Sequence, residues 1–368
     1  MEPRQLQTAI LQSPQHTLKY GLEVEDDELP VVVSHTVPKP AISSAYHVVV
    51  RVLAVALNPI DYKMLAHFPA AGNMAGCDFC GIVVERGTNA VHDVGTRVCG
   101  ATFPYSCGAF AEFLTADSRL LLRVPDTWSD SGGAALGQVG WGTASLALSD
   151  PEALGLTGLP SAPAGEGEPV LVYGAATATG TMACQLLALS GYKPIGICST
   201  QSAPLAAEFG AVSTAEYTSP SCVETVRALA GVPLRHALDC ITNADSVATC
   251  FAALARTGGR YVCLESLPES WRTRRAVRVK EVMGYEGHGN PVQVGTGLTA
   301  YSRPANPTLF ALCCNWTVEM QKLLDMGKIK HHPVKELDGR WDGIRKGLSM
   351  LKRGEVRGHK LVVRIAVS

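Results

Sequence analysis

The chain has 368 residues, of which 46% are hydrophobic and 18% are charged, and its 32 Lys and Arg residues nearly match its 33 Asp and Glu residues. A chain of this length has room for two domains with separate cores, and its balanced charge predicts no attraction to nucleic acid or to an anionic membrane surface. No apolar run reaches the roughly 18 residues that cross a bilayer, and residues 1–8 lack the pattern of a secretory signal, so a cytoplasmic location is expected.

Twelve cysteines are scattered through apolar segments such as Ile197-Cys198 and Val262-Cys263. Free cysteine behaves as a small buried hydrophobe, and disulfides are rare in cytosolic proteins. We therefore expect reduced thiols packed in the cores rather than disulfide bridges.

The first 150 or so residues predict a β-rich region. Residues 48–55 form an apolar, β-branched run that suits a buried strand, and residues 81–87 and 95–100 form shorter strands between glycine turns. Residues 155–168 are rich in Gly, Pro, Ser and Ala and have no sustained apolar period, which indicates a boundary.

From Pro169 onward, strands alternate with helices. This alternation predicts an α/β fold with a doubly wound parallel sheet. Amphipathic helices are expected at residues 318–326 and 344–353, and residues 360–365 form a last strand that pairs most simply with the N-terminal β region. The expected parallel strands are residues 169–173, 194–198, 215–217, 236–241 and 259–264, and the expected helices among them include residues 203–209 and 244–256.

The turn after the first of these strands, residues 174–180, consists of small residues and opens directly into a helical pattern. Such a turn lets the backbone approach a pyrophosphate, whose charge then lies on free N–H groups at the helix N-terminus. Only Gly174 and Gly180 are glycines, so the G-x-G-x-x-G motif is incomplete and an ordinary strand-to-helix turn is the alternative.

The second strand ends in Ser199-Thr200-Gln201-Ser202, without the carboxylate that usually binds the ribose of NAD. A neutral, hydroxyl-rich turn accepts a 2′-phosphate without charge repulsion, which favours NADPH over NADH, and Tyr217 is placed to stack beside the adenine. The turn itself contains no Arg or Lys, and Lys193 precedes the strand, so a plain polar loop is the alternative.

Four segments together resemble the medium-chain dehydrogenase/reductase superfamily: residues 58–63 (NPIDYK), 75–81 (AGCDFCG), 238–243 (LDCITN) and 360–364 (KLVVR). Within it, the chain is similar to the zinc-free, trans-acting enoyl reductases of fungal polyketide synthases, of the lovastatin enoyl reductase type. The resemblance implies a β-rich GroES-like substrate domain, an NADP-binding Rossmann domain and a C-terminal segment that returns to the substrate domain. We expect these parts at residues 1–165, 166–304 and 305–368.

Zinc alcohol dehydrogenases of this superfamily have a cysteine in the segment that matches residues 58–61, and a G-H-E motif that reads G-C-D here. Neither ligand set is reproduced. Cys77 and Cys80 form a C-x-x-C pair, but a structural zinc needs four ligands, and Cys99 and Cys107 do not have the spacing of a second pair. We therefore expect no metal.

Without a metal, the chemistry indicated is reduction of an activated C=C bond. Hydride addition to the β-carbon of an enoyl thioester places negative charge on the carbonyl oxygen, which needs a hydrogen-bond donor, and the α-carbon then needs a proton. Lys63 is the first candidate donor; it could serve the cofactor instead, or be a surface charge. The Thr143 hydroxyl is a second candidate, with helix capping as the alternative, and Asp61 is expected to hold the local geometry.

The resemblance implies further contacts, with ordinary loop structure as the alternative for each. The glycines of residues 283–289 suit a flexible wall beside an elongated apolar substrate. The implied cofactor contacts are Ile60, Asp61, Tyr62, Lys63, Ala176, Thr177, Ala178, Thr179, Ser199, Thr200, Gln201, Ser202, Tyr217, Leu264, Glu265, Arg357 and Gly358. The implied substrate contacts are Thr143, Ala144, Ser145, Leu146, Ala147, Leu148, Ser149, Asp150, Met283, Gly284, Tyr285, Glu286, Gly287, His288 and Gly289.

The sequence thus favours an NADPH-dependent enoyl reductase that acts in trans on an intermediate tethered to the acyl carrier of a polyketide synthase. A stand-alone quinone or enone oxidoreductase is the second hypothesis, and a non-catalytic, cofactor-binding scaffold is the third. Both a monomer and a dimer are compatible with the sequence.

Overall fold

The computed structural model describes residues 5–13, 29–68, 70–103, 107–165, 167–294 and 301–366. The chain divides into two compact units. The first comprises Met1–Val139, His288–Pro307 and His331–Ser368, and the second comprises Gly140–Gly287 and Thr308–Lys330. Residues 140–165 group with the second unit rather than with the N-terminal region, because their helix packs there: a Cβ added to Gly140 would lie 3.4 Å from Met182 Cγ.

The first unit is built on a mixed sheet in the order β14-β15-β3-β4-β5-β7, in which β6 also pairs with β3, and on a separate β1-β2 pair. Its strands are β1 (Leu6–Gln12), β2 (Val31–Pro38), β3 (His47–Ala56), β4 (Asp78–Arg86), β5 (Arg97–Ala101), β6 (Phe113–Asp117), β7 (Leu122–Arg123), β14 (Val334–Leu337) and β15 (Lys360–Arg364). Its helices are α1 (Pro59–His67), η2 (Ser118–Leu120), α2 (Asp130–Leu136) and α9 (Trp341–Lys352).

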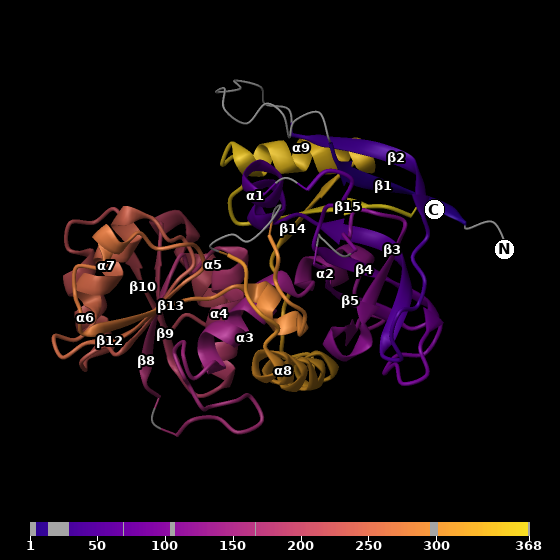
Figure 1. The fold of residues 1–368 in the computed structure, drawn as a ribbon. Helices are drawn as coiled ribbons and strands as arrows, with labels where there is room; N and C mark the ends of the chain where they lie inside the picture. The colour runs from indigo at the N-terminus through magenta and orange to yellow at the C-terminus, as the bar shows by residue number, and fades with distance from the viewer. Residues whose placement is uncertain are drawn as a thin grey trace. The chain divides into compact units, whose positions relative to one another are not determined.

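The C-terminal strand returns to the N-terminal sheet, as the sequence predicts. β15 runs antiparallel to β3, with Val363 opposite Val55, and α9 packs beside α1 (Figure 1). The side chains of Val48, Val50, Val52 and Val55 on β3 are buried, because the valine-rich run lies inside the core of this unit.

The second unit is a parallel six-stranded sheet in the order β10-β9-β8-β11-β12-β13. Helices α4 and α5 pack together, as do α6 and α7 (Figure 1). Its strands are β8 (Pro169–Tyr173), β9 (Lys193–Cys198), β10 (Ser213–Glu216), β11 (His236–Asp239), β12 (Gly259–Cys263) and β13 (Val277–Glu281). Its helices are α3 (Val139–Ser149), α4 (Ala178–Leu189), η3 (Thr200–Ser202), α5 (Ala203–Glu208), α6 (Cys222–Ala230), α7 (Ala244–Ala253), η4 (Glu269–Trp271), η5 (Gly284–His288) and α8 (Pro307–Asp325), of which α3, η5 and α8 extend by a residue at one end into the first unit.

This arrangement confirms the expected α/β fold with a doubly wound sheet beside a β-rich region. The strand order reverses between β8 and β11, and open α/β sheets bind ligands beyond the carboxyl ends of their strands at such a reversal. Two features differ from expectation: β13 adds a sixth strand, and α8 begins at Pro307, eleven residues before the expected helix at 318.

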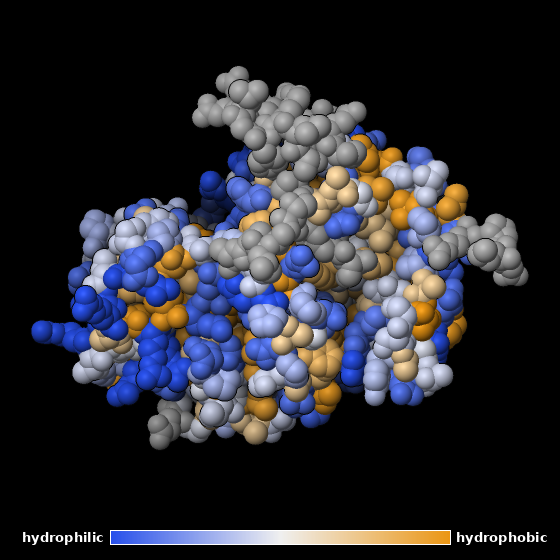
Figure 2. All heavy atoms as spheres, in the orientation of Figure 1, coloured by the Kyte–Doolittle hydropathy of each residue, from blue (hydrophilic) through white to orange (hydrophobic). Residues whose placement is uncertain are grey.

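The visible surface over α6 and β12 is mainly hydrophilic, with small apolar patches among the polar side chains (Figure 2). Within the described residues, no helix has both the length and the hydropathy that a membrane span requires. All twelve cysteines are free thiols, and all but Cys240 and Cys314 are buried, in agreement with the expected reduced, packed thiols.

Candidate active site

In the first unit, α1 begins at a buried polar cluster. Asn58 is its N-cap, Pro59 is at the first helical position, and the Asp61 carboxylate accepts the Asn58 N–H at 2.8 Å. This is one half of a capping box, which fixes the direction in which the helix leaves β3. The segment that contains Lys63 therefore starts from a rigid end.

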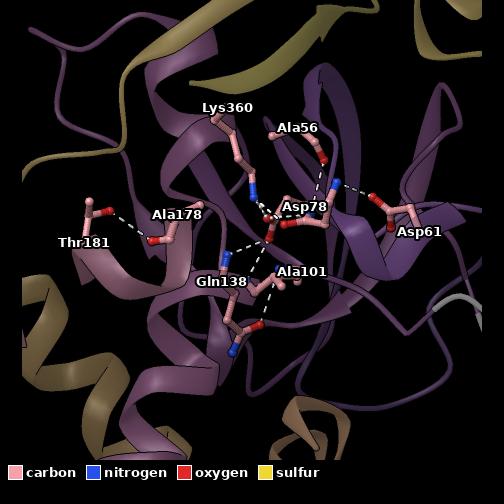
Figure 3. A network of polar contacts seen from close by, with 10 residues as sticks. Ala56, Asp61, Asp78, Ala101, Gln138, Ala178, Thr181 and Lys360 are labelled. Carbon is pink, nitrogen blue, oxygen red and sulfur yellow. Dashed lines mark hydrogen bonds and ion pairs between the residues drawn. The ribbon is translucent and has the colours of Figure 1, made fainter. Parts of the chain in front are cut away.

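The cluster is centred on Asp78, whose side chain is fully buried (Figure 3). Its Oδ1 accepts the backbone N–H groups of Gln138 and Val139 at 2.8 and 2.9 Å. Its Oδ2 accepts Asn58 Nδ2 at 2.9 Å and Lys360 Nζ at 3.0 Å. Lys360, which is 5% exposed, also donates to Asn58 Oδ1. The carboxylate thus joins β4, α1, β15 and the start of α3's backbone.

Gly137 makes this wrapping possible. Its φ is +43°, and a Cβ at this position would lie 2.3 Å from Asp78 Cγ. Any other residue would collide with the carboxylate and would be strained in this conformation. The backbone can therefore turn its two N–H groups onto Asp78 only with a glycine here.

Asp61 lies in the same cluster and is the group most affected by burial. Its pKa is raised from 3.8 to about 7, mainly by burial and also by the nearby Asp78 carboxylate, against the lowering effect of hydrogen bonds from Cys77 and Asn58 and of the charge of Lys360. A buried carboxylate with this pKa carries a proton for much of the time near neutral pH.

Replacing Asp61 with asparagine is expected to flatten the pH dependence of stability between about pH 4 and about pH 7. Because the folded-state pKa lies above the ordinary value of 3.8, the contribution of Asp61 to stability is complete below that value and is lost as the pH rises through 7. Asparagine keeps an acceptor for the Asn58 N–H, but its side chain does not ionise in this pH range. In denaturant unfolding, the wild type should lose up to about 4 kcal/mol more than the variant across this range; parallel curves would contradict the assignment.

The candidate cysteines of the first unit are buried thiols. Cys80 and Cys99 face each other across β4 and β5, and burial raises the pKa of Cys80 to about 12 and that of Cys99 well above its usual value. Both thiols are therefore protonated at neutral pH. In the part of the chain that the structure describes, no three His, Cys, Asp or Glu side chains form a group that could hold a metal ion.

In the second unit, the turn after β8 lies at the reversal of strand order. Gly174 has a φ of +76°, and a Cβ on Gly180 would lie 2.1 Å from the Gly174 carbonyl oxygen. Thr177 caps α4 by accepting the Gly180 N–H at 3.0 Å. The turn is thus drawn tightly against the start of α4, and Ala176 and Ala178 remain partly exposed. Larger side chains would fill the space that these small residues leave open, so the turn forms a cradle that fits a dinucleotide pyrophosphate.

The turn after β9 carries a charge that the sequence analysis did not place there. Glu216, the last residue of β10, lies opposite Cys198 in the neighbouring strand, and its Oε2 accepts both the N–H and the hydroxyl of Thr200. The residues of the turn itself predicted a neutral turn, but Glu216 places a negative charge beside it. Lys193, the first residue of β9, lies at the opposite end of that strand.

Asp239 is a buried residue whose role the sequence analysis missed. At the end of β11 its Oδ1 accepts the N–H groups of Ile241 and Thr242, each at 2.9 Å, and its Oδ2 accepts Ser246 Oγ at 2.6 Å and Tyr261 OH at 2.8 Å. Thr242 has a φ of +57°, which is strained for a β-branched residue, and its hydroxyl accepts the Leu264 N–H at 3.2 Å. Asp239 thus orders the loop beside the nucleotide turn, where Ile241 Cγ1 would lie 2.9 Å from a Cβ on Gly174.

Thr143 and Gly284, two expected substrate contacts, lie close together. A Cβ on Gly284 would lie 2.8 Å from Thr143 Oγ1, and one on Gly287 would lie 2.3 Å from Cys313 Sγ. The segment 284–287 therefore packs directly on α3 and α8, and its glycines are needed for that approach.

Comparisons with known proteins agree with this geometry. The family model described as "Alcohol dehydrogenase GroES-like domain" matches residues 44–126, and the one described as "Zinc-binding dehydrogenase" matches residues 178–270. The trans-enoyl reductase sthE of Phaeosphaeria nodorum is 54% identical over 374 aligned residues, covering 100% of both chains. The trans-enoyl reductase calK of Penicillium decumbens is 51% identical, covering 98% of both. The chain belongs to the trans-enoyl reductase family.

Solved structures resemble this trans-enoyl reductase in fold alone. The enoyl reductase CurK has a TM-score of 0.70 at 19% identity, covering 97% of this chain and 99% of that one. The quinone oxidoreductase of Pseudomonas syringae pv. Tomato DC3000 has a TM-score of 0.70 at 21% identity, with the same coverage. The family is part of the medium-chain dehydrogenase/reductase superfamily, which implies a nicotinamide cofactor, and the cradle between Gly174 and Gly180 fits it.

The other expected cofactor contacts of this trans-enoyl reductase lie at several separate places. Ile60, Tyr62 and Lys63 are partly exposed on α1, whereas Arg357 and Gly358 precede β15, Arg357 being exposed. In the second unit, Leu264 and Glu265 follow β12, and Ser199–Ser202 lies beside Tyr217, which is 50% exposed. These assignments remain predictions.

The expected substrate contacts on α3 of this enzyme are mostly inside the second unit. Thr143 and Ser149 are partly exposed, but Ser149 Oγ accepts Trp316 Nε1 at 3.0 Å. Among the loop residues, Met283, Tyr285 and Glu286 are partly exposed, and His288 and Gly289 group with the first unit. Thr143 and Gly284 lie together, and their contact with substrate remains a prediction. The expected contacts that are buried are Ala144, Ser145, Leu146, Ala147 and Leu148 on α3 and Asp150 directly after it.

Proposed function

We propose that the protein reduces the C=C bond of an α,β-unsaturated thioester carried by the acyl carrier of a partner polyketide synthase, with NADPH as the reductant. The observation that carries this proposal is the 54% and 51% identity, over essentially the full chain, to two trans-enoyl reductases. The second unit supports it through the tight glycine turn at the reversal of strand order.

The cofactor, when bound, supplies a hydride. For binding it, the second unit offers the N–H groups at the start of α4, where Thr177 already orders the turn. Tyr217 offers an exposed aromatic face for the adenine. Asp239 and Thr242 hold the adjoining loop in one conformation, so that little ordering is left for the moment of binding.

The substrate needs a donor at its thioester carbonyl, where reduction of the conjugated bond places negative charge. We assign this role to Lys63, with the Thr143 hydroxyl as a further donor toward the substrate. Asp61 is a positioning residue, because it caps the helix on which Lys63 lies. Gly284 lies directly against the Thr143 hydroxyl, and only a residue without a Cβ fits there.

We further propose that the reaction needs no zinc. Asp78, which stands where zinc dehydrogenases of the superfamily have the glutamate of G-H-E, uses both oxygens for Lys360, Asn58 and two backbone N–H groups. Hydride addition to an activated double bond is assisted by hydrogen-bond donors at the thioester carbonyl and does not require a Lewis acid.

The proposal is tested with the purified enzyme, NADPH and an α,β-unsaturated thioester loaded on the carrier domain of a polyketide synthase. Oxidation of NADPH with an equal yield of saturated acyl carrier, followed by absorbance and mass spectrometry, is expected. Free quinones, assayed in parallel, should be reduced far more slowly. Equal or faster turnover of quinones would favour a stand-alone quinone reductase, and binding of NADPH without oxidation by any enoyl thioester would identify a scaffold.

A further inference from the structure

The acidic residue Glu216 occupies the hydrogen-bond donors of the turn that is proposed to receive the adenosine end of the cofactor. It lies at the end of β10, and the parallel register places it beside the end of β9. Its Oε2 accepts the N–H and the hydroxyl of Thr200, and its Oε1 accepts Thr218 Oγ1 at 3.1 Å. Three donors thus hold one carboxylate.

Two further contacts lie within the turn. Ser199 Oγ accepts the Ser202 N–H at 3.2 Å and donates to Ser202 Oγ at 2.9 Å. Thr200 is exposed, and its two donors point to Glu216 alone. A ligand anion that takes hydrogen bonds from Thr200 must therefore displace Glu216.

The carboxylate is both ionised and easy to move. Hydrogen bonds from Thr200 hold the pKa of Glu216 below its usual value, so it is negatively charged at neutral pH. Among the described residues, it forms no ion pair with a Lys, Arg or His. Because it lies at the surface, rotation of its side chain into water costs only the hydrogen bonds that it leaves.

We propose that Glu216 is a residue that determines cofactor specificity, and that it competes with the 2′-phosphate of NADPH for the N–H and hydroxyl of Thr200. This inference rests on the proposed use of NADPH. Both groups are anions, so they cannot share these donors, and the side chain leaves the turn when the phosphate binds. NADH has no 2′-phosphate, so the carboxylate stays in place. Glu216 therefore lowers the affinity for NADPH and leaves that for NADH unchanged.

The test compares four ligands by isothermal titration calorimetry: NADPH, NADH, 2′,5′-ADP and 5′-AMP. Glu216→Gln removes the charge, and Glu216→Ala also removes the competing acceptor. Each should bind NADPH and 2′,5′-ADP about 10-fold more tightly than the wild type, since a like charge is removed from the contact distance of the phosphate. Binding of NADH and 5′-AMP should change by less than about twofold.

The matched control is Glu224→Gln, which removes the same charge from an exposed position in the first turn of α6. It should leave all four affinities unchanged. Unchanged NADPH affinity in both Glu216 variants would overturn the inference while leaving the proposed function intact. Selective loss of NADH binding in these variants would also overturn it, because Glu216 would then hold the ribose hydroxyls. A wild type that binds neither dinucleotide would overturn the proposed function itself.

Discussion

Lys360→Met is expected to lower the free energy of unfolding of the first unit by about 3–5 kcal/mol, because it leaves the buried Asp78 carboxylate without its cation. Lys360 is 5% exposed and Asp78 is fully buried, so water cannot replace the lost partner. The Asn58 side chain loses a donor in the same step. The measurement is denaturant unfolding, with amide exchange at α1 as a local readout.

Two further variants distinguish the effect of leaving a buried charge unpaired from the effect of removing a lysine as such. Lys39→Met removes an ion pair of similar length, 2.8 Å to Glu85, whose side chains are 18% and 48% exposed, and should cost less than about 1 kcal/mol. Adding Asp78→Asn to Lys360→Met removes the uncompensated charge but keeps an acceptor for the Gln138 and Val139 N–H groups. The double variant should therefore be more stable than Lys360→Met alone. A loss below about 1 kcal/mol for Lys360→Met would show that this pair does not tie the cluster together.

The regular elements were predictable because local patterns encode them. The β-branched run of β3 and the alternation of short apolar strands with helices after Pro169 depend only on neighbouring residues. The nucleotide turn was found for the same reason, since its small residues are contiguous. β13 was missed because three of the five residues of Val277–Glu281 are charged and the strand lies at the edge of the sheet, where the apolar signal is weak.

The polar clusters of the site were not predictable from local patterns. Asp78 and Lys360 are 282 residues apart in the chain, and no local pattern linked their side chains. Glu216 was not predicted as a ribose-binding acid, because such an acid is expected at the end of β9, whereas Glu216 lies at the end of the neighbouring strand β10. Asp239 reads in sequence as the end of a strand, and only the fold shows four donors converging on it. The strand order of the folded chain decides which distant residues become hydrogen-bond partners, and a single sequence does not reveal that order.

Lys63→Met is expected to lower kcat/KM for the carrier-bound enoyl thioester by about 100-fold or more, as loss of a transition-state donor does. Lys63 lies on the helix whose first turn is held by Asn58, Asp61 and the buried Asp78. The fixed start of this helix positions the Lys63 backbone, which reduces the ordering that remains for its side chain when the charge develops. Steady-state kinetics with NADPH and the thioester varied separately, and NADPH affinity measured by calorimetry, provide the test.

The control is Lys352→Met, which removes an exposed lysine from the end of α9 and should leave both kinetic constants unchanged. Whether the loss of kcat/KM comes from kcat or from binding of NADPH identifies the role of Lys63. A fall in kcat with unchanged NADPH affinity would place the ammonium group at the charge that develops on the thioester, whereas a rise in the KM and Kd for NADPH with kcat preserved would place it on the cofactor. An unchanged kcat/KM in a folded Lys63→Met variant would remove this lysine from the mechanism and leave the Thr143 hydroxyl as the donor to be tested next.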